Sequence, residues 1–159
     1  MITQARLKDL LHYDPDTGVF VWKVARGRKS AGAQAGTVNA RTGYVYVCVG
    51  GKVMLAHRLA YFYETGEWPP AQIDHINRDK SDNRWINLRC ATAAENSRNA
   101  PSRTETKGVT WHRIGQKWQA QIVVNNKRVY LGLFANKEEA HAAYCKAAQE
   151  LHGAFAAVA

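Results

Sequence analysis

Four polar side chains in the middle of the chain are of the types that carry hydrolytic chemistry. Asp74 and His75 are adjacent, Asn87 follows His75 by 12 positions, and Asn96 follows Asn87 by 9. A hard cation such as Mg²⁺ takes oxygen ligands, so the Asp74 carboxylate and the Asn96 amide suit it, with water and a substrate phosphate completing the shell. An imidazole near its ordinary pKa accepts a proton at neutral pH, so His75 is suited to act as a general base towards water. Asn87 is then expected to hold the loop or the imidazole by hydrogen bonds.

The pattern around these side chains predicts a strand, a loop with a return strand, and a helix. Asp74 and His75 lie in a short apolar run that predicts a strand, and the return strand brings in Asn87. Adjacent strand residues point to opposite faces, so the first two can serve one metal site only if the backbone bends there. Thr92 and Glu95 have capping-box spacing, so the helix that carries the fourth residue is expected to begin at Thr92.

The charge distribution indicates a polyanionic partner. The chain has a formal net charge of +9 and a pI near 9.7. Residues 1–56 carry +5, residues 57–100 are balanced, and residues 101–159 carry +4. Such basic flanks are expected to grip phosphates, while the neutral middle keeps its carboxylates for chemistry or metal binding.

Composition favours a soluble globular protein without a membrane partner. The chain has 159 residues, 46% of them hydrophobic, which suffices for one ordinary domain or two small ones. No run approaches the roughly 18 apolar residues that span a bilayer, and the start lacks the features of a signal peptide, so a cytoplasmic location is expected. Cys48, Cys90 and Cys145 are far apart and form no C-x-x-C pair, so buried, reduced thiols are expected.

Turn and cap residues outline the N-terminal half. Residues 6–23 predict a short helix, a turn at the "DPDTG" run and a strand. Alternating side chains on either side of Gly50 and Gly51 predict a hairpin. Residues 57–66 predict a helix that ends at its glycine.

The C-terminal part predicts a second module. Residues 100–106 are polar, contain Pro and lack periodicity, so the expected domains are 1–100 and 101–159. Beyond the linker, three short strands precede an Ala-rich helix that Asn136 caps and Gly153 stops. The expected fold class is therefore α+β, with a β-hairpin region at the N-terminus and a small three-stranded antiparallel sheet packed on one helix at the C-terminus.

The motifs "HRL", "DHIN", "DNR", "NLR" and "ENSRN", in this order within residues 57–100, resemble the phage group-I-intron type of HNH homing endonuclease. The resemblance implies a ββα-metal module with His75 as general base, Asp74 and Asn96 as metal ligands, and a structural role for Asn87. The third motif position is Asn96 rather than His, an H-N-N variant, and its neutral amide favours one Mg²⁺ or Mn²⁺ ion per site over Zn²⁺. If the chain is phage encoded, its place of action is the cytoplasm of a bacterial host cell.

The C-terminal strands are expected to present one polar face, because period-two geometry turns alternate side chains towards the helix and away from it. The side chains expected on the helix side are Val109, Trp111, Trp118, Ala120, Ile122, Val129 and Leu131. Those expected outside are Thr110, His112, Gln119, Gln121, Val123, Arg128 and Tyr130, with Lys107, Arg113, Lys117 and Lys127 at the margins. Such a face can read base edges and hold phosphates in the major groove.

The runs "KGVTWHR", "KWQAQI", "RVYLGLF" and "EEAHAAYCKAA" resemble the plant ethylene-response-factor (APETALA/ERF) DNA-binding domain. The resemblance places DNA contacts at Lys107, Thr110, Gln121, Val123, Arg128 and Tyr130. Several family arginines are missing, with Thr110 and Val123 in their place, so base specificity does not carry over.

Together these features predict a metal-dependent DNA endonuclease that acts on double-stranded DNA, with no obligate protein partner. The C-terminal sheet finds a site and the HNH module hydrolyses a phosphodiester bond, leaving 5′-phosphate and 3′-hydroxyl ends. The residues expected to bind DNA are Arg58, Arg84, Arg89, Lys107, Thr110, His112, Arg113, Lys117, Gln119, Gln121, Arg128 and Tyr130. The first three are equally compatible with surface ion pairs.

A non-catalytic DNA-binding regulator with a degenerate HNH scaffold is the main alternative. The presence of all four motif residues argues against it. A structural or protein-interaction module leaves the basic flanks and the polar sheet face unexplained. His57 is compatible with orienting the site or contacting phosphate, but because it begins an apolar helix it is interpreted as a packing or capping residue. Asn83 is interpreted as a turn residue that ranks below Asn87.

Overall fold

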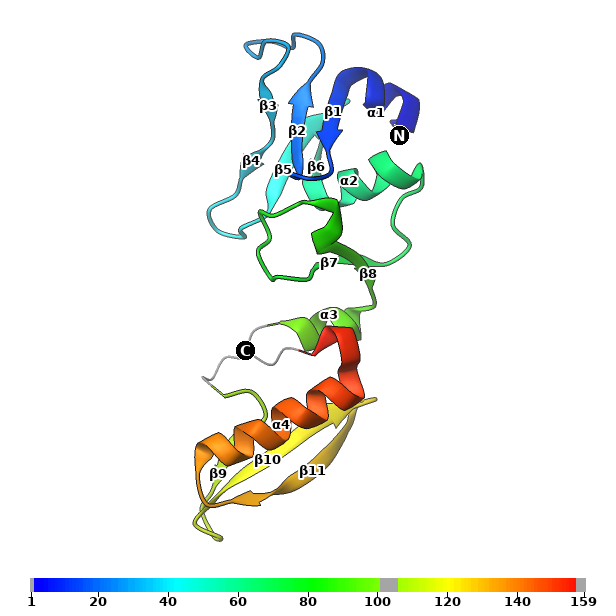
Figure 1. The fold of residues 1–159 in the computed structure, drawn as a ribbon. Helices are drawn as coiled ribbons and strands as arrows, with labels where there is room; N and C mark the ends of the chain where they lie inside the picture. Colours follow the sequence, from blue (N-terminus) through cyan, green and yellow to red (C-terminus); the bar gives the residue numbers. More distant parts are fainter. Residues whose placement is uncertain (1, 101–105, 157–159) are drawn as a thin grey trace. The chain divides into compact units, whose positions relative to one another are not determined.

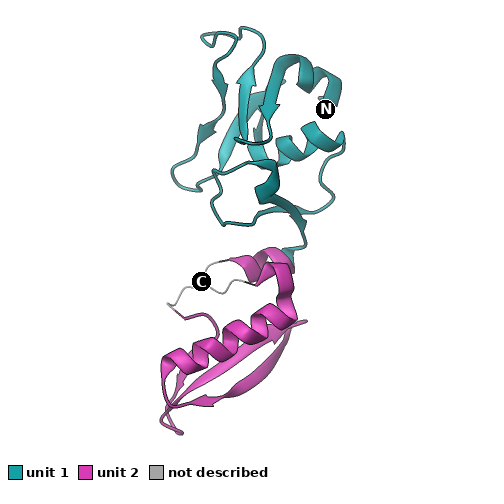
Figure 2. Cartoon of the chain, in the orientation of Figure 1, with its two compact units in different colours: residues 1–93 teal, residues 94–159 magenta. Residues whose placement is uncertain are grey.

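Small antiparallel sheets alternate with short helices along the chain, as the computed structural model shows for residues 2–100 and 106–156 (Figure 1). The expected α+β class is confirmed. The chain divides into two units, residues 1–93 and 94–159, which are coloured separately in Figure 2. The boundary between the units lies before Asn96, so Asn96 belongs to the second unit. Most of the predicted linker, residues 101–105, lies outside the described residues.

The first unit begins with a helix and a three-stranded sheet in the order β1-β2-β3. These elements are α1 (Gln4–Leu10), β1 (Leu11–Asp14), β2 (Val19–Trp22) and β3 (Gln34–Ala35). Thr3 caps α1 by accepting a hydrogen bond from the Arg6 amide. The predicted turn joins β1 to β2, where the Asp14 carboxylate accepts from the Asp16 amide at 3.0 Å. The helix, turn and second strand are confirmed, while β1 was not predicted.

A second sheet and a helix follow. They are β4 (Thr37–Val38), β5 (Val45–Val49), β6 (Lys52–Leu55) and α2 (Ala56–Thr65). Gly50 and Gly51 have φ of 60° and 74°, the left-handed conformation that a tight two-residue hairpin turn requires. Gly66 ends α2 in the left-handed conformation, with φ of 81°. Both the hairpin and the helix end are confirmed.

One apolar cluster joins these elements. It takes side chains from α1, β1, β2, β5 and α2, among them Leu7, Leu11, Phe20, Val47 and Leu59. Each of these five is at most 2% exposed, so the cluster removes nearly all of their apolar surface from water. The same helix α2 carries His57 in its first turn, so the core fixes an element that contributes to the candidate site.

The first unit closes with a two-stranded sheet formed by β7 (Gln72–His75) and β8 (Leu88–Ala91). The loop between them ends in a short 3-10 helix, η1 (Trp85–Asn87). The predicted strand that delivers Asp74 and His75, and the return strand, are therefore present.

The second unit is a sheet in the order β11-β10-β9, packed on one helix. Its elements are α3 (Ala93–Asn99), β9 (Val109–His112), β10 (Lys117–Val124), β11 (Lys127–Phe134), α4 (Lys137–His152) and a short 3-10 helix, η2 (Gly153–Phe155). Asn136 caps α4 by accepting a hydrogen bond from the Glu139 amide at 2.8 Å. The three predicted strands and the Ala-rich helix are confirmed.

Two side chains of this sheet are more exposed than predicted. Trp111 is 45% exposed and Val129 is 40% exposed, although both were expected to be buried. Their cross-strand partners are Trp118 and Ile122, so each lies on the predicted face. Because β9 and β11 are the edge strands, their side chains have neighbours on one side only and remain partly open to solvent.

No helix among residues 2–100 and 106–156 has the length and apolar content to cross a membrane.

Candidate active site and nucleic-acid interface

Asp74 is buried and paired with an arginine. It lies on β7 directly opposite Arg89 on β8, and only 5% of the residue is exposed. Arg89 Nε donates to Asp74 Oδ2 at 2.8 Å, and Arg89 Nη2 lies 2.7 Å from the same oxygen as an ion pair. A buried carboxylate keeps its charge when a cation stands beside it. Arg89 therefore fixes the position of the Asp74 carboxylate inside the protein.

His75, the last residue of β7, is held by the side chain of Asn83. His75 is 4% exposed as a residue, and its Nε2 lies 3.3 Å from Asn83 Oδ1. Asn83 Nδ2 donates to the Ser81 carbonyl at 2.9 Å, which fixes the orientation of the amide. Because the amide oxygen that faces the ring can only accept, this contact favours the tautomer of neutral His75 with its proton on Nε2.

Burial lowers the pKa of His75, and the hydrogen bond to Asn83 and the charge of Asp74 oppose that shift only in part. The imidazole is thus neutral at physiological pH, the state a general base needs.

Two further rings surround His75. His57 packs edge-on against it with 5.0 Å between ring centroids, and Tyr44 lies 6.0 Å away. Burial, followed by the neighbouring His75 and Arg58, lowers the pKa of His57 to about 3, so this ring is also neutral. His57 is indeed a packing residue, but it packs against the candidate base. The sequence left a role in orienting the site open for His57, and the structure places its ring against His75 although 18 positions separate the two histidines.

Asn87 closes the loop between β7 and β8. Its Oδ1 accepts from the Asn77 amide at 2.9 Å, and its Nδ2 donates to Asn77 Oδ1 at 2.9 Å and to the Asp82 carbonyl at 2.8 Å. The backbone carbonyl of Asn87 also accepts from the Ile76 amide. With 6% of the residue exposed, these bonds stabilise the loop that positions Asn83.

The N-terminal hairpin supports this loop from outside. The Tyr13 hydroxyl donates to the Asn83 carbonyl at 2.7 Å, and the Trp85 amide donates to the Pro15 carbonyl at 2.9 Å. Asn83 thus has its backbone held by the hairpin and its side chain directed to His75. The sequence indicated it only through the "DNR" motif, and turn chemistry alone explained it equally well.

The register of β7 and β8 is continuous through the Asp-His pair. Asp74 pairs with Arg89 and His75 with Leu88, without a shift between them. The bend that a shared metal site requires is therefore not visible as a bulge in this ladder. The strand ends at His75, where the Arg78 amide donates to the His75 carbonyl and the chain turns into the loop.

Asn96 lies on α3, which begins at Ala93, one residue beyond the predicted Thr92. It belongs to the second unit, and its role as a metal ligand stays a prediction. Within the described ranges, His, Cys, Asp and Glu side chains form no group of three or more with the arrangement of a metal site.

Three arginines predicted to bind DNA have partners inside the protein. Arg89 pairs with Asp74, Arg84 with Asp82 at 2.6 Å, and Arg58 Nη1 donates to the Ala71 carbonyl at 3.2 Å. Arg89 is positioned to orient the Asp74 carboxylate, and its contact with DNA remains a prediction.

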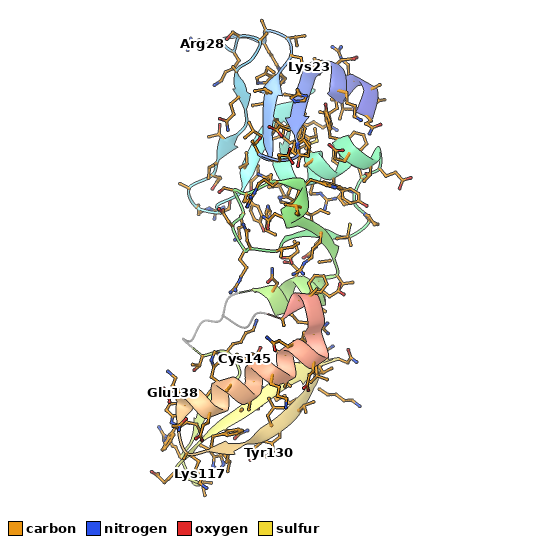
Figure 3. The ribbon with its side chains drawn as sticks, viewed as in Figure 1. Lys23, Arg28, Lys117, Tyr130, Glu138 and Cys145 are labelled. Atoms are coloured by element: carbon orange, nitrogen blue, oxygen red, sulfur yellow. The ribbon has the colours of Figure 1, made fainter. Side chains whose placement is uncertain are left out.

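The outer face of the second sheet brings the predicted polar side chains together. Cross-strand partners on this face are Gln121 with Tyr130, Gln119 with Thr110, Val123 with Arg128, and Lys117 with His112. Tyr130 is 59% exposed, and it is labelled with Lys117 in Figure 3. Leu133, opposite Gln119, adds an apolar side chain that was not predicted, and Arg113 is exposed in the β9–β10 turn. Lys107 instead donates to the Arg98 and Ala100 carbonyls.

Comparison with known proteins defines two segments. Residues 54–98 match the family model of an HNH endonuclease, and residues 104–154 match that of an AP2 domain. Both resemblances drawn from the motifs are confirmed. An uncharacterized HNH endonuclease of Acanthamoeba polyphaga mimivirus is 34% identical over 110 residues, which cover 67% of this chain and 57% of the relative. The match thus spans little more than half of the relative's length.

Proposed function

We propose that the protein is a metal-dependent endonuclease that hydrolyses phosphodiester bonds of double-stranded DNA. The observation that supports this most directly is a neutral, oriented His75 next to the ion-paired Asp74, inside the segment that matches the HNH endonuclease family. A base and an ionised oxygen ligand at one strand end are the two groups that hydrolysis of a phosphodiester needs.

His75 Nδ1 takes the proton from the attacking water in this mechanism. Because Asn83 fixes the proton on Nε2, the lone pair on Nδ1 has one direction and the ring does not have to change tautomer. The His57 ring stays neutral beside it, so it adds no positive charge that would oppose protonation of His75 in the transition state.

The donor chemistry fits a hard divalent ion. The Asp74 carboxylate, positioned by Arg89, is an oxygen ligand of the kind that Mg²⁺ or Mn²⁺ takes. The HNH resemblance adds the amide oxygen of Asn96 as a second ligand. A bound ion would stabilise charge on the scissile phosphate and on the leaving 3′ oxygen.

The sheet of the second unit is the proposed DNA-binding surface. Its outer face carries Gln119, Gln121, Arg128 and Tyr130 on two adjacent strands. Amide and guanidinium groups on a sheet of this size can reach base edges and phosphates in a major groove. The viral source of the matched relative is consistent with a phage-encoded homing enzyme that acts in the host cytoplasm.

Incubation of supercoiled plasmid with the purified chain and Mg²⁺ tests the proposal. Nicked or linear DNA is expected, and chelation of the metal is expected to stop its formation. His75→Ala should abolish cleavage and keep DNA binding, because the proposed base is not needed for the DNA-binding face. His12→Ala, which removes an exposed histidine from β1, is the matched control and should cut normally. Binding without cleavage under any divalent metal would instead favour a DNA-binding regulator.

A further inference from the structure

A loop that precedes the HNH segment lies against the candidate base. Residues 39–44 join β4 to β5, and the Tyr44 ring at the end of this loop has its centroid 5.2 Å from that of His57 and 6.0 Å from that of His75. Because β5 pairs with β6, and β6 leads directly into α2, the start of β5 lies beside the first turn of that helix. The loop lies outside residues 54–98, so the match to the HNH family assigns no role to Tyr44.

Lys80 ties this loop to the one that carries Asn83. Its Nζ donates to the Thr42 carbonyl at 3.3 Å and lies 4.9 Å from the centroid of the Tyr44 ring. The face of an aromatic ring attracts an ammonium group, so the two contacts hold the charge of this long side chain over the ring. Lys80 is exposed, and its ammonium can therefore meet a ligand that arrives from solvent.

The nearby carboxylates have other partners. Asp82 is paired with Arg84 at 2.6 Å. Asp79 Oδ1 accepts from the Ser81 amide at 2.9 Å and from the Ser81 hydroxyl at 2.7 Å. Within the described part of the chain, Lys80 forms no ion pair with a carboxylate. Since an ammonium has three N–H donors and the carbonyl contact uses one, both donors and charge are available to an anion.

The spacing of the cation and the base suits one phosphate group. A base, an attacking water, a phosphate and a cation in line span roughly 10 Å, because the base lies within hydrogen-bond reach of the water and the reacting atoms are slightly farther apart. Lys80 and His75 both contact the Tyr44 ring, at the 4.9 Å and 6.0 Å given above, so their separation cannot greatly exceed this span. The Tyr44 ring thus spaces the ammonium from the candidate base.

We propose that Lys80 is a further catalytic residue, which binds a non-bridging oxygen of the scissile phosphate, and that the Tyr44 ring positions its ammonium beside His75. Negative charge on the phosphate oxygens is stabilised by a cation that is already in place when the water attacks. The inference rests on the proposed endonuclease activity and adds to it two residues that neither family resemblance assigns.

Single-turnover cleavage of supercoiled plasmid tests the role of Lys80, with the full chain in excess and Mg²⁺ present. Lys80→Gln should slow cleavage about a hundredfold, because a fixed charge on the scissile phosphate is lost. Lys80→Arg keeps the charge and should recover part of the rate. Lys52→Gln removes an equal charge next to the turn of the β5–β6 hairpin, at the far end of β5 from Tyr44, and should cut at the natural rate.

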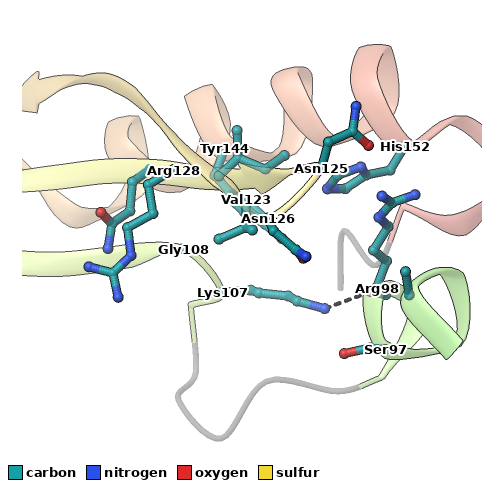
Figure 4. Close-up of a pocket in the computed structure, with 13 residues that line it drawn as sticks. Ser97, Arg98, Lys107, Gly108, Val123, Asn125, Asn126, Arg128, Tyr144 and His152 are labelled. Carbon is teal, nitrogen blue, oxygen red and sulfur yellow. Dashed lines mark hydrogen bonds between the residues drawn. The ribbon is translucent and has the colours of Figure 1, made fainter.

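DNA affinity is the second measurement, made by fluorescence anisotropy with a labelled duplex and without Mg²⁺. Lys80→Gln should weaken binding by no more than about threefold, since one phosphate contact among several is lost. Arg128→Gln should show the opposite balance, with its main effect on affinity. Its side chain lines a pocket of about 400 Å³ at the end of the second sheet (Figure 4), and Lys107 in the same pocket is also among the residues predicted to bind DNA.

Two substitutions of Tyr44 test its positioning role. Tyr44→Phe keeps the ring and should retain more of the cleavage rate than Tyr44→Leu, which removes the surface under the ammonium. The Lys80 variants decide the proposal even if Tyr44→Leu does not fold, because Lys80 is exposed. If the natural chain cuts and Lys80→Gln cuts as fast, or loses only affinity, the inference is wrong and the proposed function stands. A natural chain that does not cut would refute the proposed function and this inference together.

Discussion

Two buried asparagines between β7 and β8 have different structural roles. Asn87 uses its amide within the loop, bonding to Asn77 and to the Asp82 carbonyl. Asn83 directs its amide oxygen at His75 and its amide nitrogen at the Ser81 carbonyl. Since Asn83 is only 2% exposed, water cannot replace it as the acceptor for Nε2. Asn83 is therefore a positioning residue for the proposed base.

Replacing Asn83 by Ala should reduce kcat for plasmid cleavage by about a hundredfold and leave DNA affinity nearly unchanged, because the base loses its orientation. Asn83→Asp keeps an acceptor for Nε2 and adds a charge that favours the imidazolium. It should recover part of the rate and move the acidic limb of the pH–rate profile to higher pH. A variant in which affinity and rate fall together, with no change in the profile, would show that Asn83 only stabilises the fold.

His57 makes stability depend on pH. A histidine in the unfolded chain titrates near its ordinary value, whereas the pKa of folded His57 is lowered to about 3. Between these values the unfolded state binds a proton that the folded state does not, so stability falls as the pH is lowered. Between about pH 7 and about pH 5, this histidine should lower the free energy of unfolding by on the order of 2 kcal/mol. Urea unfolding at both pH values measures this decrease in stability. The decrease should be smaller for His57→Phe than for the natural chain, and it should be the same for His12→Phe as for the natural chain.

At the level of elements, the β1–β2 turn braces the loop that carries Asn83. A Cβ on Gly18 would lie 2.4 Å from the Arg84 nitrogen and from the Asn83 carbonyl carbon. Only a residue without a side chain permits this approach. The turn is thus a support for the proposed active site, although it contributes no reactive group.

Gly18→Ala should destabilise the first unit and slow cleavage, because the new methyl group must displace the loop backbone. Gly27→Ala is the matched control: its φ of 58° is also left-handed, but its Cβ would meet no atom within 4 Å. The control should lower the free energy of unfolding by about 1 kcal/mol, while Gly18→Ala should lower it by about 3 kcal/mol or more. Chemical unfolding and plasmid cleavage measure the two effects. An equal loss of stability in both variants would show that the close contact between the turn and the loop does not contribute to stability.

Short sequence patterns predicted the positions of most helices, strands and turns, but they did not predict the contacts between side chains that are distant in the sequence. The helix ends at Gly66 and Gly153, the hairpin at Gly50 and the cap at Asn136 follow from single residues whose backbone preferences act locally. Contacts such as Tyr13 with Asn83, 70 positions apart, depend on how elements pack. The exposure of Trp111 and Val129 was missed for a related reason, since alternation gives the face of a side chain but not whether its strand is at an edge.

On the scale of the whole molecule, each unit has its own core. The first is built around Leu7, Phe20 and Leu59, and the second around Ile122, Ala140 and Tyr144. The charge is also divided, with surplus cations in the N-terminal residues 1–56 and in the C-terminal residues 101–159. DNA is therefore expected to meet cations from both units.

Salt should weaken DNA binding steeply as a result. If about six phosphates are neutralised, affinity should fall on the order of a thousandfold between about 50 mM and about 200 mM salt, because condensed counterions are released on binding. Arg128→Gln removes a cation from the proposed face and should lower the slope of log affinity against log salt by about one. Lys146→Gln changes the net charge equally from the exposed side of α4 and should leave the slope unchanged. Fluorescence anisotropy with a labelled duplex measures all three slopes. A flat response in the natural chain would rule out phosphate contacts as the main source of affinity.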